Sequence, residues 1–431
     1  MTGLPDGWRM LSLNEVAHGG LFNDGDWVET KDQDPQGSVR LTQLADVGVG
    51  EFRDRSSRWL REDQAADLHC TFLQPSDVLI ARMPEPIGRA CLAPEGIGRA
   101  ITAVDVAILR VNDPEVDPRY VMWAVNNPKF HAAVETLQSG TTRKRISRKN
   151  LATLAIPIPD LHEQRRIVDI LEDHLSRLDA TDVSFVSVRA KMTALRDAII
   201  HSALFADQAG EAEQRSQATV GEVADVDSGP AFKSSLFGGP GEGTRLLRGD
   251  NIEPGSLRWG RTKSWPDSQV VGFEHLLVAD GDIILAMDRP VVTAGLKLAR
   301  VTAADMPALL VQRVARIRPR NTVVDDFLYQ ILSSRQFVHE LLGNQVGTQI
   351  PHITLEAIRK FPFLLPEPAV QIAIAKQVRA QIESTGRVER DITLASTRSR
   401  SLRRALLGAA FSGRLTGRAA DMEMVEEMAG V

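Results

Sequence analysis

The residues of this chain that suggest chemistry are basic and amide side chains in loop-like stretches. Arg is the side chain that most often reads guanine, through O6 and N7, while Asn and Gln pair with adenine. Loops held by a rigid scaffold are where such binding residues concentrate. In the first half of the chain we expect DNA contacts from Lys31, Gln43, Arg82, Arg89, Thr141, Arg143, Lys144 and Arg145. In the second half we expect them from Lys233, Arg245, Arg248, Asn251, Arg289, Lys297, Gln345, Thr348, Gln349 and His352.

The distribution of charge supports these candidates, although the total does not. The net charge is −5, which argues weakly against a nucleic-acid partner, but the local arrangement of charges sets the local field. Residues 143–149 contain no acid, segment 244–263 holds five basic residues against two acidic ones, and segment 398–404 holds four arginines. The alternative for each candidate is a solvated surface charge. Only a minority would specify sequence, because phosphate contacts position the protein without reading bases.

Patterns typical of catalysis are weak. Asn127-Pro128-Lys129-Phe130 is similar to the Asn-Pro-Pro-Phe/Tyr loop of adenine methyltransferases, but residues 1–126 lack the Gly-rich turn that would hold a cofactor. A helix break is the better interpretation. The Gly-rich segment 238–243 lacks the lysine of a phosphate loop, and the nine histidines show no metal-ligand spacing. Asp77 and Asp282 stand at strand starts, where a role in a turn is favoured over one in a carboxylate nuclease. We therefore expect no catalytic residue, metal site or cofactor in this chain.

Length and composition bound the class of protein. With 431 residues the chain suits about two to four domains. Its 43% hydrophobic and 25% charged residues are ordinary for a globular protein. No apolar run approaches the roughly 18–20 residues that cross a bilayer, and the N-terminus has no signal-peptide pattern. Cys70 and Cys91 are too few for a disulfide framework or a four-cysteine zinc site, so we expect two free thiols in a reducing cytoplasm.

The elements that position the candidate residues occur in two copies, 207 residues apart. A period this long indicates a duplicated domain followed by a duplicated helix, since solenoid repeats run to about 20–50 residues. The matching pairs are Gln138-Ser139-Gly140-Thr141 with Gln345-Val346-Gly347-Thr348, Pro159-Asp160 with Pro366-Glu367, and Leu195-Arg196-Asp197-Ala198 with Leu402-Arg403-Arg404-Ala405. Such a chain suggests a pseudo-two-fold molecule, and duplex DNA has a matching two-fold backbone symmetry.

Each half begins with a region of short apolar runs punctuated by Gly and Pro, which predicts strands and loops. The expected strands are 39–44, 77–82 and 104–109 in the first half, and 244–249, 282–287 and 311–317 in the second. A helical stretch follows each set, at about 118–137 and 325–342. The sequence therefore predicts an α+β fold in both halves.

Each half ends in a long helix with a 3.5-residue apolar repeat, which is typical of a coiled-coil seam. Alternating steps of four and three from Ile167 meet apolar residues at eight of ten positions, and the equivalent series from Ile374 at seven of ten. The predicted seam residues are Ile167, Leu171, Leu178, Phe185, Met192, Leu195, Ile374, Val378, Val388, Ile392, Leu402 and Leu406. At 1.5 Å per residue, 167–199 span roughly 50 Å. The linker between halves is short, so we expect the two helices to pair antiparallel, and their length to fix the separation of the two domains.

In this architecture the chain resembles the specificity (S) subunit of Type I restriction–modification systems over nearly its whole length. No single motif is specific; the order and repetition of several are. The patterns are Asn23-Asp24-Gly25-Asp26-Trp27, Val39-Arg40-Leu41-Thr42-Gln43-Leu44, Arg248-Gly249-Asp250-Asn251-Ile252, Asp77-Val78-Leu79, Asp282-Ile283-Ile284, the junction from Ile156-Pro157-Ile158-Pro159 to Gln164-Arg165-Arg166-Ile167-Val168, and the segment from Leu402 to Gly413.

The resemblance implies a division of the chain into target recognition domains and helices. Residues 1–160 would form the first target recognition domain, 161–205 the central coiled-coil helix, 206–217 a linker, 218–367 the second target recognition domain, 368–413 the C-terminal coiled-coil helix and 414–431 a flexible tail. Each domain would read one half of a bipartite, asymmetric sequence in double-stranded DNA.

The resemblance also implies partners and a lack of catalysis in this chain. The helices would dock two methyltransferase (M) subunits, which hold S-adenosylmethionine. A restriction (R) subunit, which uses ATP and Mg²⁺, can join them. The second helix start, residues 369–373, is less charged than the first, residues 163–166, so the two docking surfaces would differ in strength. The two recognition domains differ strongly between the shared patterns, so we expect different half-sites.

Two other functions stay open on the residues alone. One is a methyltransferase or nuclease complete in one chain, which the missing cofactor turn and metal cluster oppose. The other is a coiled-coil scaffold without a DNA role, which the basic segments oppose.

Overall fold

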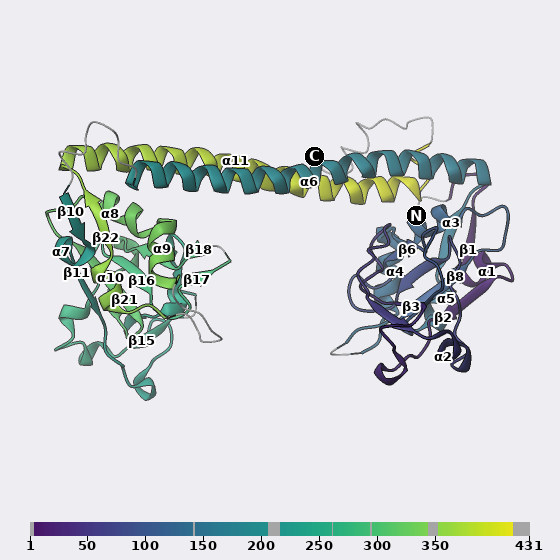
Figure 1. Cartoon of the computed structure of the whole chain (residues 1–431), viewed down its shortest axis with the longest axis horizontal. Helices are drawn as coiled ribbons and strands as arrows, with labels where there is room; N and C mark the ends of the chain where they lie inside the picture. The colour runs from purple at the N-terminus through teal and green to yellow at the C-terminus, as the bar shows by residue number, and fades with distance from the viewer. Residues whose placement is uncertain are drawn as a thin grey trace. The chain divides into compact units, whose positions relative to one another are not determined.

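The computed structural model describes residues 4–140, 143–205, 216–260, 262–293, 295–343 and 352–416. The chain forms two compact units: Met1–Val186 with Ile392–Val431 make up unit 1, and Ser187–Asp391 make up unit 2. Each unit contains one strand-rich region and part of both long helices, α6 (Leu161–Phe205) and α11 (Pro368–Ala410) (Figure 1). The predicted linker and tail fall largely outside the described residues.

The strand-rich region of unit 1 contains three small sheets. A four-stranded antiparallel sheet has the order β2-β8-β5-β6. A second sheet, β4-β3-β7, pairs β3 antiparallel with β4 and parallel with β7, and β1 pairs with β9. The strands are β1 (Arg9–Ser12), β2 (Leu21–Asp24), β3 (Val39–Thr42), β4 (Arg58–Leu60), β5 (Val78–Ala81), β6 (Ala90–Leu92), β7 (Ala100–Thr102), β8 (Val106–Arg110) and β9 (Ala155–Ile158).

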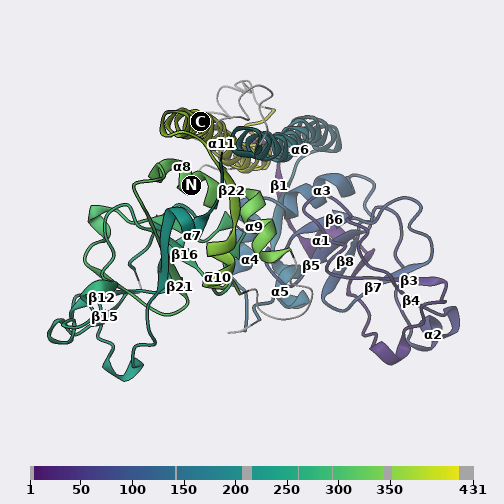
Figure 2. The same cartoon turned by 60° about the vertical axis from the view of Figure 1, so that its left-hand side comes forward.

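Unit 2 repeats these sheets with the same order and the same strand directions. Figure 2 labels strands of both strand-rich regions, among them β3 and β4 of unit 1 and β12 and β15 of unit 2. Their orders are β11-β21-β16-β19, β15-β12-β20 and β10-β22. The strands are β10 (Ser216–Thr219), β11 (Ala224–Ser228), β12 (Thr244–Leu247), β15 (Lys263–Trp265), β16 (Ile283–Ala286), β19 (Leu298–Arg300), β20 (Ala308–Leu310), β21 (Val314–Pro319) and β22 (Pro362–Leu365). Two hairpins, β13 (Ile252–Glu253) with β14 (Ser256–Leu257) and β17 (Val291–Val292) with β18 (Gly295–Leu296), are additional in unit 2. The predicted α+β duplication is confirmed.

Three short helices lie between β8 and β9 in unit 1 (α3, α4 and α5), and three lie between β21 and β22 in unit 2 (α8, α9 and α10). The first residues of equivalent helices are 207 positions apart, which is the period of the sequence repeat. The helices of unit 1 are α1 (Leu13–Ala17), α2 (Glu62–Asp67), α3 (Pro118–Val125), α4 (Pro128–Thr136) and α5 (Arg148–Thr153); those of unit 2 are α7 (Val220–Val223), α8 (Asp325–Leu332), α9 (Arg335–Leu342) and α10 (Leu355–Lys360). The predicted break between α3 and α4 is confirmed. Asn127 caps α4, its side chain accepting the N–H of Lys129, and Pro128 takes the first helical position.

The central strands β5 and β16 are buried along their whole length, and an aspartate precedes each of them. Asp77 accepts the amide N–H of the residue three positions earlier and two bonds of 2.7 Å from Arg110. Asp282 does the same with Arg318, at 2.6 and 2.8 Å. The predicted turn role is confirmed. The bidentate carboxylate also raises the pKa of the Arg110 guanidinium, as expected for a charge-assisted pair.

A buried glutamine joins each long helix to its strand-rich region. Gln164, near the start of α6, has no exposed surface. Its side-chain oxygen accepts the N–H of Asp117, which caps α3, at 2.8 Å. Its amide nitrogen donates to the carbonyls of Glu115 and Pro159 at 3.0 and 2.9 Å. The bond to Pro159 is buried and the other two are partly buried, so the glutamine satisfies backbone groups that would otherwise be costly to shield from water.

Unit 2 contains the same joint. Gln371 is buried, accepts the N–H of Val324 at 2.7 Å and donates to the carbonyl of Pro366 at 2.7 Å. The two glutamines occupy equivalent positions of the sequence repeat, and each connects a helix start to the loop before α3 or α8. The joint is therefore a property of the repeated unit.

An ion pair reinforces each joint, with its charges exchanged between the units. Arg119 on α3 binds Glu172 on α6, with 2.6 Å between Nη2 and Oε2. At the equivalent positions of the second copy, Asp326 on α8 binds Arg379 on α11. The same contact is thus kept while the acid and the base change sides.

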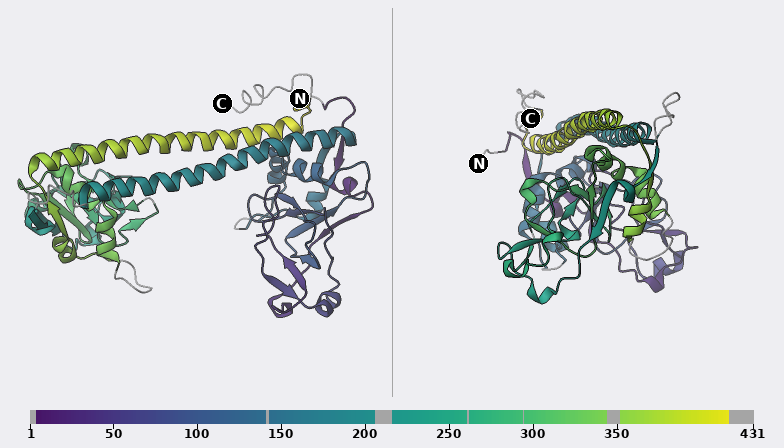
Figure 3. Two further views of the ribbon diagram at one scale, coloured as in Figure 1. Left: turned by 45° about the horizontal axis from the view of Figure 1, so that its top comes forward. Right: turned by 90° about the vertical axis from the view of Figure 1, so that its left-hand side faces the viewer.

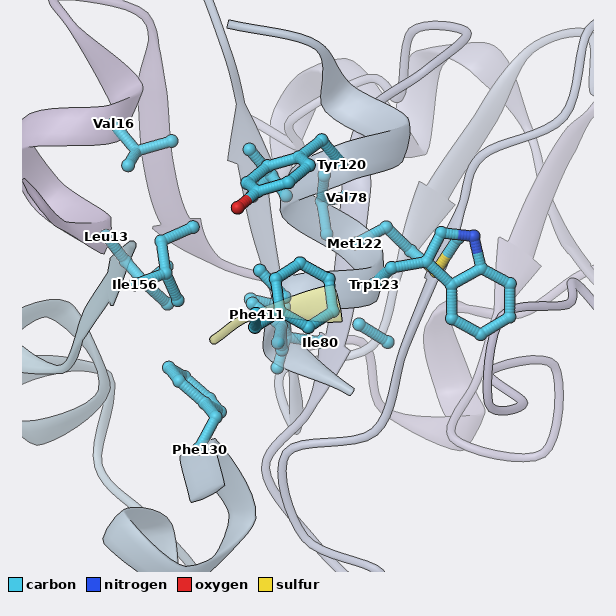
Figure 4. Close-up of a cluster of buried hydrophobic side chains, with 14 of the residues drawn as sticks. Leu13, Val16, Val78, Ile80, Tyr120, Met122, Trp123, Phe130, Ile156 and Phe411 are labelled. Carbon is cyan, nitrogen blue, oxygen red and sulfur yellow. The ribbon is translucent and has the colours of Figure 1, made fainter. Parts of the chain in front are cut away.

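Both long helices contribute to the core of each unit. In unit 1, Leu171 and Leu175 of α6 belong to the same apolar cluster as Leu406 and Leu407 of α11. This cluster includes Phe411, just past α11, whose ring meets that of Tyr120 edge-on at 5.2 Å (Figure 4). The first part of α6 therefore lies beside the last part of α11.

In unit 2 the opposite ends of the helices are paired. Ile200 and Leu204 of α6 cluster with Ile374 and Val378 of α11. In each unit the helices run side by side in opposite directions, as two further views show (Figure 3). The predicted antiparallel pairing is confirmed.

The seam runs differently from the predicted one in the middle of the helices. Leu195 and Val388 are 52% and 36% exposed, so their assignment to the seam is wrong. A straight α-helix drifts by about 20° per heptad from a 3.5-residue repeat, which moves burial on α6 from Leu195 to Ile200. Of the remaining predicted seam residues, Ile167, Leu171, Ile374, Val378, Ile392 and Leu406 are buried, and Leu178, Phe185, Met192 and Leu402 are half-buried.

Cys70 and Cys91 are free thiols, as predicted, and burial raises the pKa of Cys70 to about 11 and that of Cys91 to about 12. In the described part of the chain, no helix is both long and apolar enough to cross a membrane.

Candidate nucleic-acid interface

A basic cleft in unit 2, about 770 Å³ in volume, brings together side chains from loops far apart in the sequence. The loops follow β11, β12 and β16 and precede β19, β21 and α10. The lining residues are Phe232, Ser234, Phe237, Arg248, Gly249, Asp250, Asp288, Arg289, Lys297, Val311, Gln312, Arg313 and His352. Four of the predicted DNA contacts, Arg248, Arg289, Lys297 and His352, are among them. Lys233, a fifth, is exposed and stands between two lining residues in the chain.

The polar side chains of this cleft hold one another in place. Asp288 lies 2.5 Å from Nδ1 of His352 and 3.7 Å from Nε of Arg313. Arg313 and His352 approach each other to 3.4 Å. Lys297 donates through Nζ to the carbonyl of Gly249. Asp250, the second carboxylate of the cleft, lies 3.6 Å from Nη2 of Arg248. A ligand therefore meets a mainly cationic surface, in which Asp288 orients His352 and Arg313.

Two arginines of the cleft stand on a left-handed backbone. Arg289 has φ = 48° and Arg313 has φ = 67°. This conformation costs an ordinary L residue about 1–2 kcal/mol, and where it occurs it gathers at functional sites. Glycine would adopt the same backbone conformation at a lower free-energy cost, so the two arginine side chains are kept at positions that do not favour them.

The wall of the cleft is aromatic and rigid. Phe232 packs against Trp265 and Phe273, with ring centroids 4.7 and 5.1 Å apart, and Phe237 packs against Trp265 at 6.4 Å. Aromatic rings in such offset contacts form a fixed apolar surface. Groups that bind here would meet a shaped wall beside the cationic side chains.

In unit 1 the loop before α5 presents three consecutive exposed basic residues. Arg143, Lys144 and Arg145 are exposed, and none of the three forms an ion pair with any residue that the structure describes. Ser139 and Arg145 exchange two backbone bonds of 2.9 Å, and Ile146 is fully buried. The loop is therefore anchored at its base with its charges in solvent, which suits contacts to an anion.

The remaining predicted residues of unit 1 differ in what they can offer. Lys31 is exposed and pairs with Glu29 at 2.8 Å. Gln43 is half-buried at the end of β3. Thr141 lies outside the described residues, and so do Gln345, Thr348 and Gln349 of the second half.

Four predicted DNA contacts instead hold the fold together, and we leave them out of the interface. Arg89 is buried and donates to the carbonyls of Leu44, Val47, Pro84 and Pro86. Because all its donors point inward, it has no group to offer a base.

Arg82, Arg245 and Asn251 are used in the same way. Arg82 donates to the carbonyl of Val104 at 2.7 Å. Arg245 donates to that of Met306 at 2.8 Å and stacks over Trp259. Asn251 is buried, and its side chain accepts the N–H of Arg248. Sequence alone could not separate these roles, because the carbonyls that these arginines bind include ones from distant segments of the chain.

Sequence reasoning also missed two residues. Arg313 lines the cleft but occurs within a predicted strand. Trp27 is 70% exposed and its Nε1 lies 3.4 Å from Glu29. Trp27 and the candidate Lys31 both approach Glu29, so this exposed ring is a further candidate, and the signal that could have found it was its place after Gly25-Asp26.

The comparisons with known proteins agree with the duplicated architecture. The family model for the Type I restriction modification DNA specificity domain matches residues 5–182 and again residues 216–391. The chain therefore belongs to this family, and the resemblance drawn from the sequence is confirmed.

Among curated proteins the chain is similar to two named specificity subunits. It is 28% identical over 273 residues to the Type I restriction enzyme MjaVIII specificity subunit of Methanocaldococcus jannaschii, covering 62% of this chain and 63% of that subunit. It is 24% identical over 504 residues to the Type I restriction enzyme EcoAI specificity subunit of Escherichia coli, covering 95% of this chain and 83% of that subunit.

Two solved structures share the fold. One chain, from work described as the structural basis underlying complex assembly and conformational transition of the type I R-M system, gives a TM-score of 0.78 at 18% identity, covering 96% of this chain and all of that one. The HsdS subunit from Thermoanaerobacter tengcongensis gives a TM-score of 0.56 at 17% identity, covering 96% and 98%.

Proposed function

We propose that this chain is the subunit that reads a bipartite, asymmetric DNA sequence and directs adenine methylation and restriction by partner M and R subunits. Unit 1 reads one half of the site and unit 2 the other. The family match to both strand-rich regions supports a DNA specificity role for each.

One observation supports two different half-sites. The units share their sheets strand for strand, yet their exposed loop side chains differ. Unit 1 presents the loop Arg143–Arg145, while unit 2 presents the cleft around Arg289 and Arg313. Because base readout depends on which side chains reach the groove, one scaffold with two sets of loops reads two sequences.

The chain contributes recognition, and its partners contribute the chemistry. Two M subunits hold S-adenosylmethionine and transfer the methyl group, and R subunits supply ATP- and Mg²⁺-dependent translocation and cleavage. The complex acts in the cytoplasm, where it meets the DNA. The long helices are the docking surface that we propose for M. They expose apolar side chains, including Val183 and Val186 in unit 1 and Ile372 in unit 2, which a protein partner would cover.

The test is genome-wide adenine methylation by long-read sequencing, in cells with and without this chain plus its neighbouring methyltransferase. We expect a split motif with two different halves and a fixed gap that disappears with the chain. No lost motif would contradict the proposal. Methyl transfer from labelled S-adenosylmethionine by the isolated chain would favour an enzyme, and unchanged DNA binding after charge reversal at Arg143, Lys144 and Arg145 would favour a scaffold.

A further inference from the structure

The cleft of unit 2 contains a pair of arginines whose placement goes beyond general DNA affinity. Six non-glycine residues of the described chain have positive φ, and two of them are Arg289 and Arg313. Aspartate, asparagine and histidine tolerate this conformation best, so arginine is an uncommon choice. Both positions lie on one cleft although they come from separate loops, one after β16 and one before β21.

The surroundings orient the two side chains differently. Arg313 is 59% exposed and is steadied by Asp288, which His352 also contacts. Arg289 is exposed, and within the described residues it makes no ion pair. It starts the loop into hairpin β17–β18, and Lys297 follows that hairpin. The guanidinium of Arg313 is therefore oriented by an ion pair, whereas that of Arg289 has no such partner among the described residues. Both arginines line the same cleft.

Unit 1 has no arginine at either equivalent position. Arg289 is the third residue after β16, and the third residue after the equivalent strand β5 is Pro84. Arg313 directly precedes β21, and Asp105 directly precedes β8. The arginine pair therefore occurs in unit 2 alone. Side chains that make one half-site differ from the other must differ between the units in this way.

We propose that Arg289 and Arg313 read guanine in the half-site of unit 2, each through the O6 and N7 acceptors of one base. The planar guanidinium matches that acceptor pair with two parallel bonds. Asp288 and His352 act as positioning residues that hold Arg313 toward the groove. This inference rests on the proposed function and adds the base that one half-site must contain.

The test uses the complex with the M subunit and unmethylated duplexes that carry the motif recognised by the wild-type complex. Arg289→Ala and Arg313→Ala should each lower the preference for guanine at one position of one half-site by about 5- to 150-fold. Arg313→Lys keeps the charge but cannot make the paired bonds, so it should lose the same preference. Arg320→Ala is the matched control. It stands just past the other end of β21, bound to Asp225, and should leave the motif unchanged.

A chemical probe separates base reading from phosphate binding. 7-Deazaguanine at the affected position removes N7 and should slow methylation by the wild-type complex, with no further loss in the arginine variants. An equal loss on all sequences, with a salt slope lower by about 1, would identify phosphate contacts and overturn the proposal. So would a motif that the variants leave intact. A wild-type complex with no sequence-defined site would instead contradict the proposed function itself.

Discussion

Replacing Gln164 with methionine should loosen the joint between α6 and the strand-rich region of unit 1. Methionine is similar in size, so the change removes the polar groups and leaves little empty volume. The partly buried N–H of Asp117 loses its acceptor, and the carbonyls of Glu115 and Pro159 lose a donor.

The cost follows from these three groups. A buried donor without a partner costs about 1–3 kcal/mol, and the carbonyls add less, because each keeps a second lone pair. We expect unit 1 to lose about 2–5 kcal/mol of unfolding free energy. For a unit of about 200 residues, each kcal/mol lowers Tm by about 2–4 °C, which gives a fall of about 4–20 °C.

Calorimetry and amide hydrogen exchange measure the two consequences. Gln164→Met should lower the transition of unit 1 and speed exchange at Asp117. Gln371→Met should act in the same way on unit 2 and on Val324. Gln377→Ala is the control, since this glutamine is exposed on α11. A stability within about 0.5 kcal/mol of wild type, which is the range of neutral surface changes, together with a protected Asp117 amide, would refute the role assigned to the glutamine.

Phe411→Ala should cost unit 1 about 3–5 kcal/mol, because it removes a buried ring from the core that α11 completes; urea unfolding measures it, and Leu394→Ala, exposed on α11, should change stability by less than about 0.5 kcal/mol. The Arg119→Asp change with Glu172→Arg should copy the charge order of unit 2 and restore most of what either single change loses. In a double-mutant cycle the coupling should be about 0.5–1 kcal/mol, since both side chains are partly exposed, and zero coupling would contradict the ion pair. Burial raises the pKa of Asp26 to about 6 although the Thr71 N–H opposes it. The folded state therefore holds this proton more tightly than the unfolded state, and the stability contributed by the group falls as pH rises from about 4 to 6. Asp26→Asn should remove that dependence and stabilise the chain at pH 7 by about 1 kcal/mol, because solvent screens a carboxyl that is only partly buried, whereas an equal effect at pH 4 and pH 7 would exclude this cause.

Much of the architecture could be predicted because it depends on periodic patterns. The long sequence repeat, the all-apolar strands after Asp77 and Asp282, and the heptad spacing of the helices each carry a signal along the chain. The break at Asn127 could be predicted because a cap followed by proline is a local feature.

The interface could be predicted only in part, because its residues are selected by contacts between distant segments. Arg89 and Arg289 look alike in the sequence, yet one is surrounded by four carbonyls and the other faces solvent. Leu195 continues the apolar series, but the drift between about 3.5 and 3.6 residues per turn moves it out of the seam.

Patterns along the chain were enough to predict a duplicated α+β protein with two long helices and basic loops. Its local patterns specify each element, and its repetition specifies that the elements occur twice. Only the tertiary fold shows which polar side chains form hydrogen bonds within the protein and which remain exposed for contacts to DNA. Burial and hydrogen bonding depend on the residues that surround a side chain in space, and the loops of unit 2 meet at one cleft only when the sheets have formed.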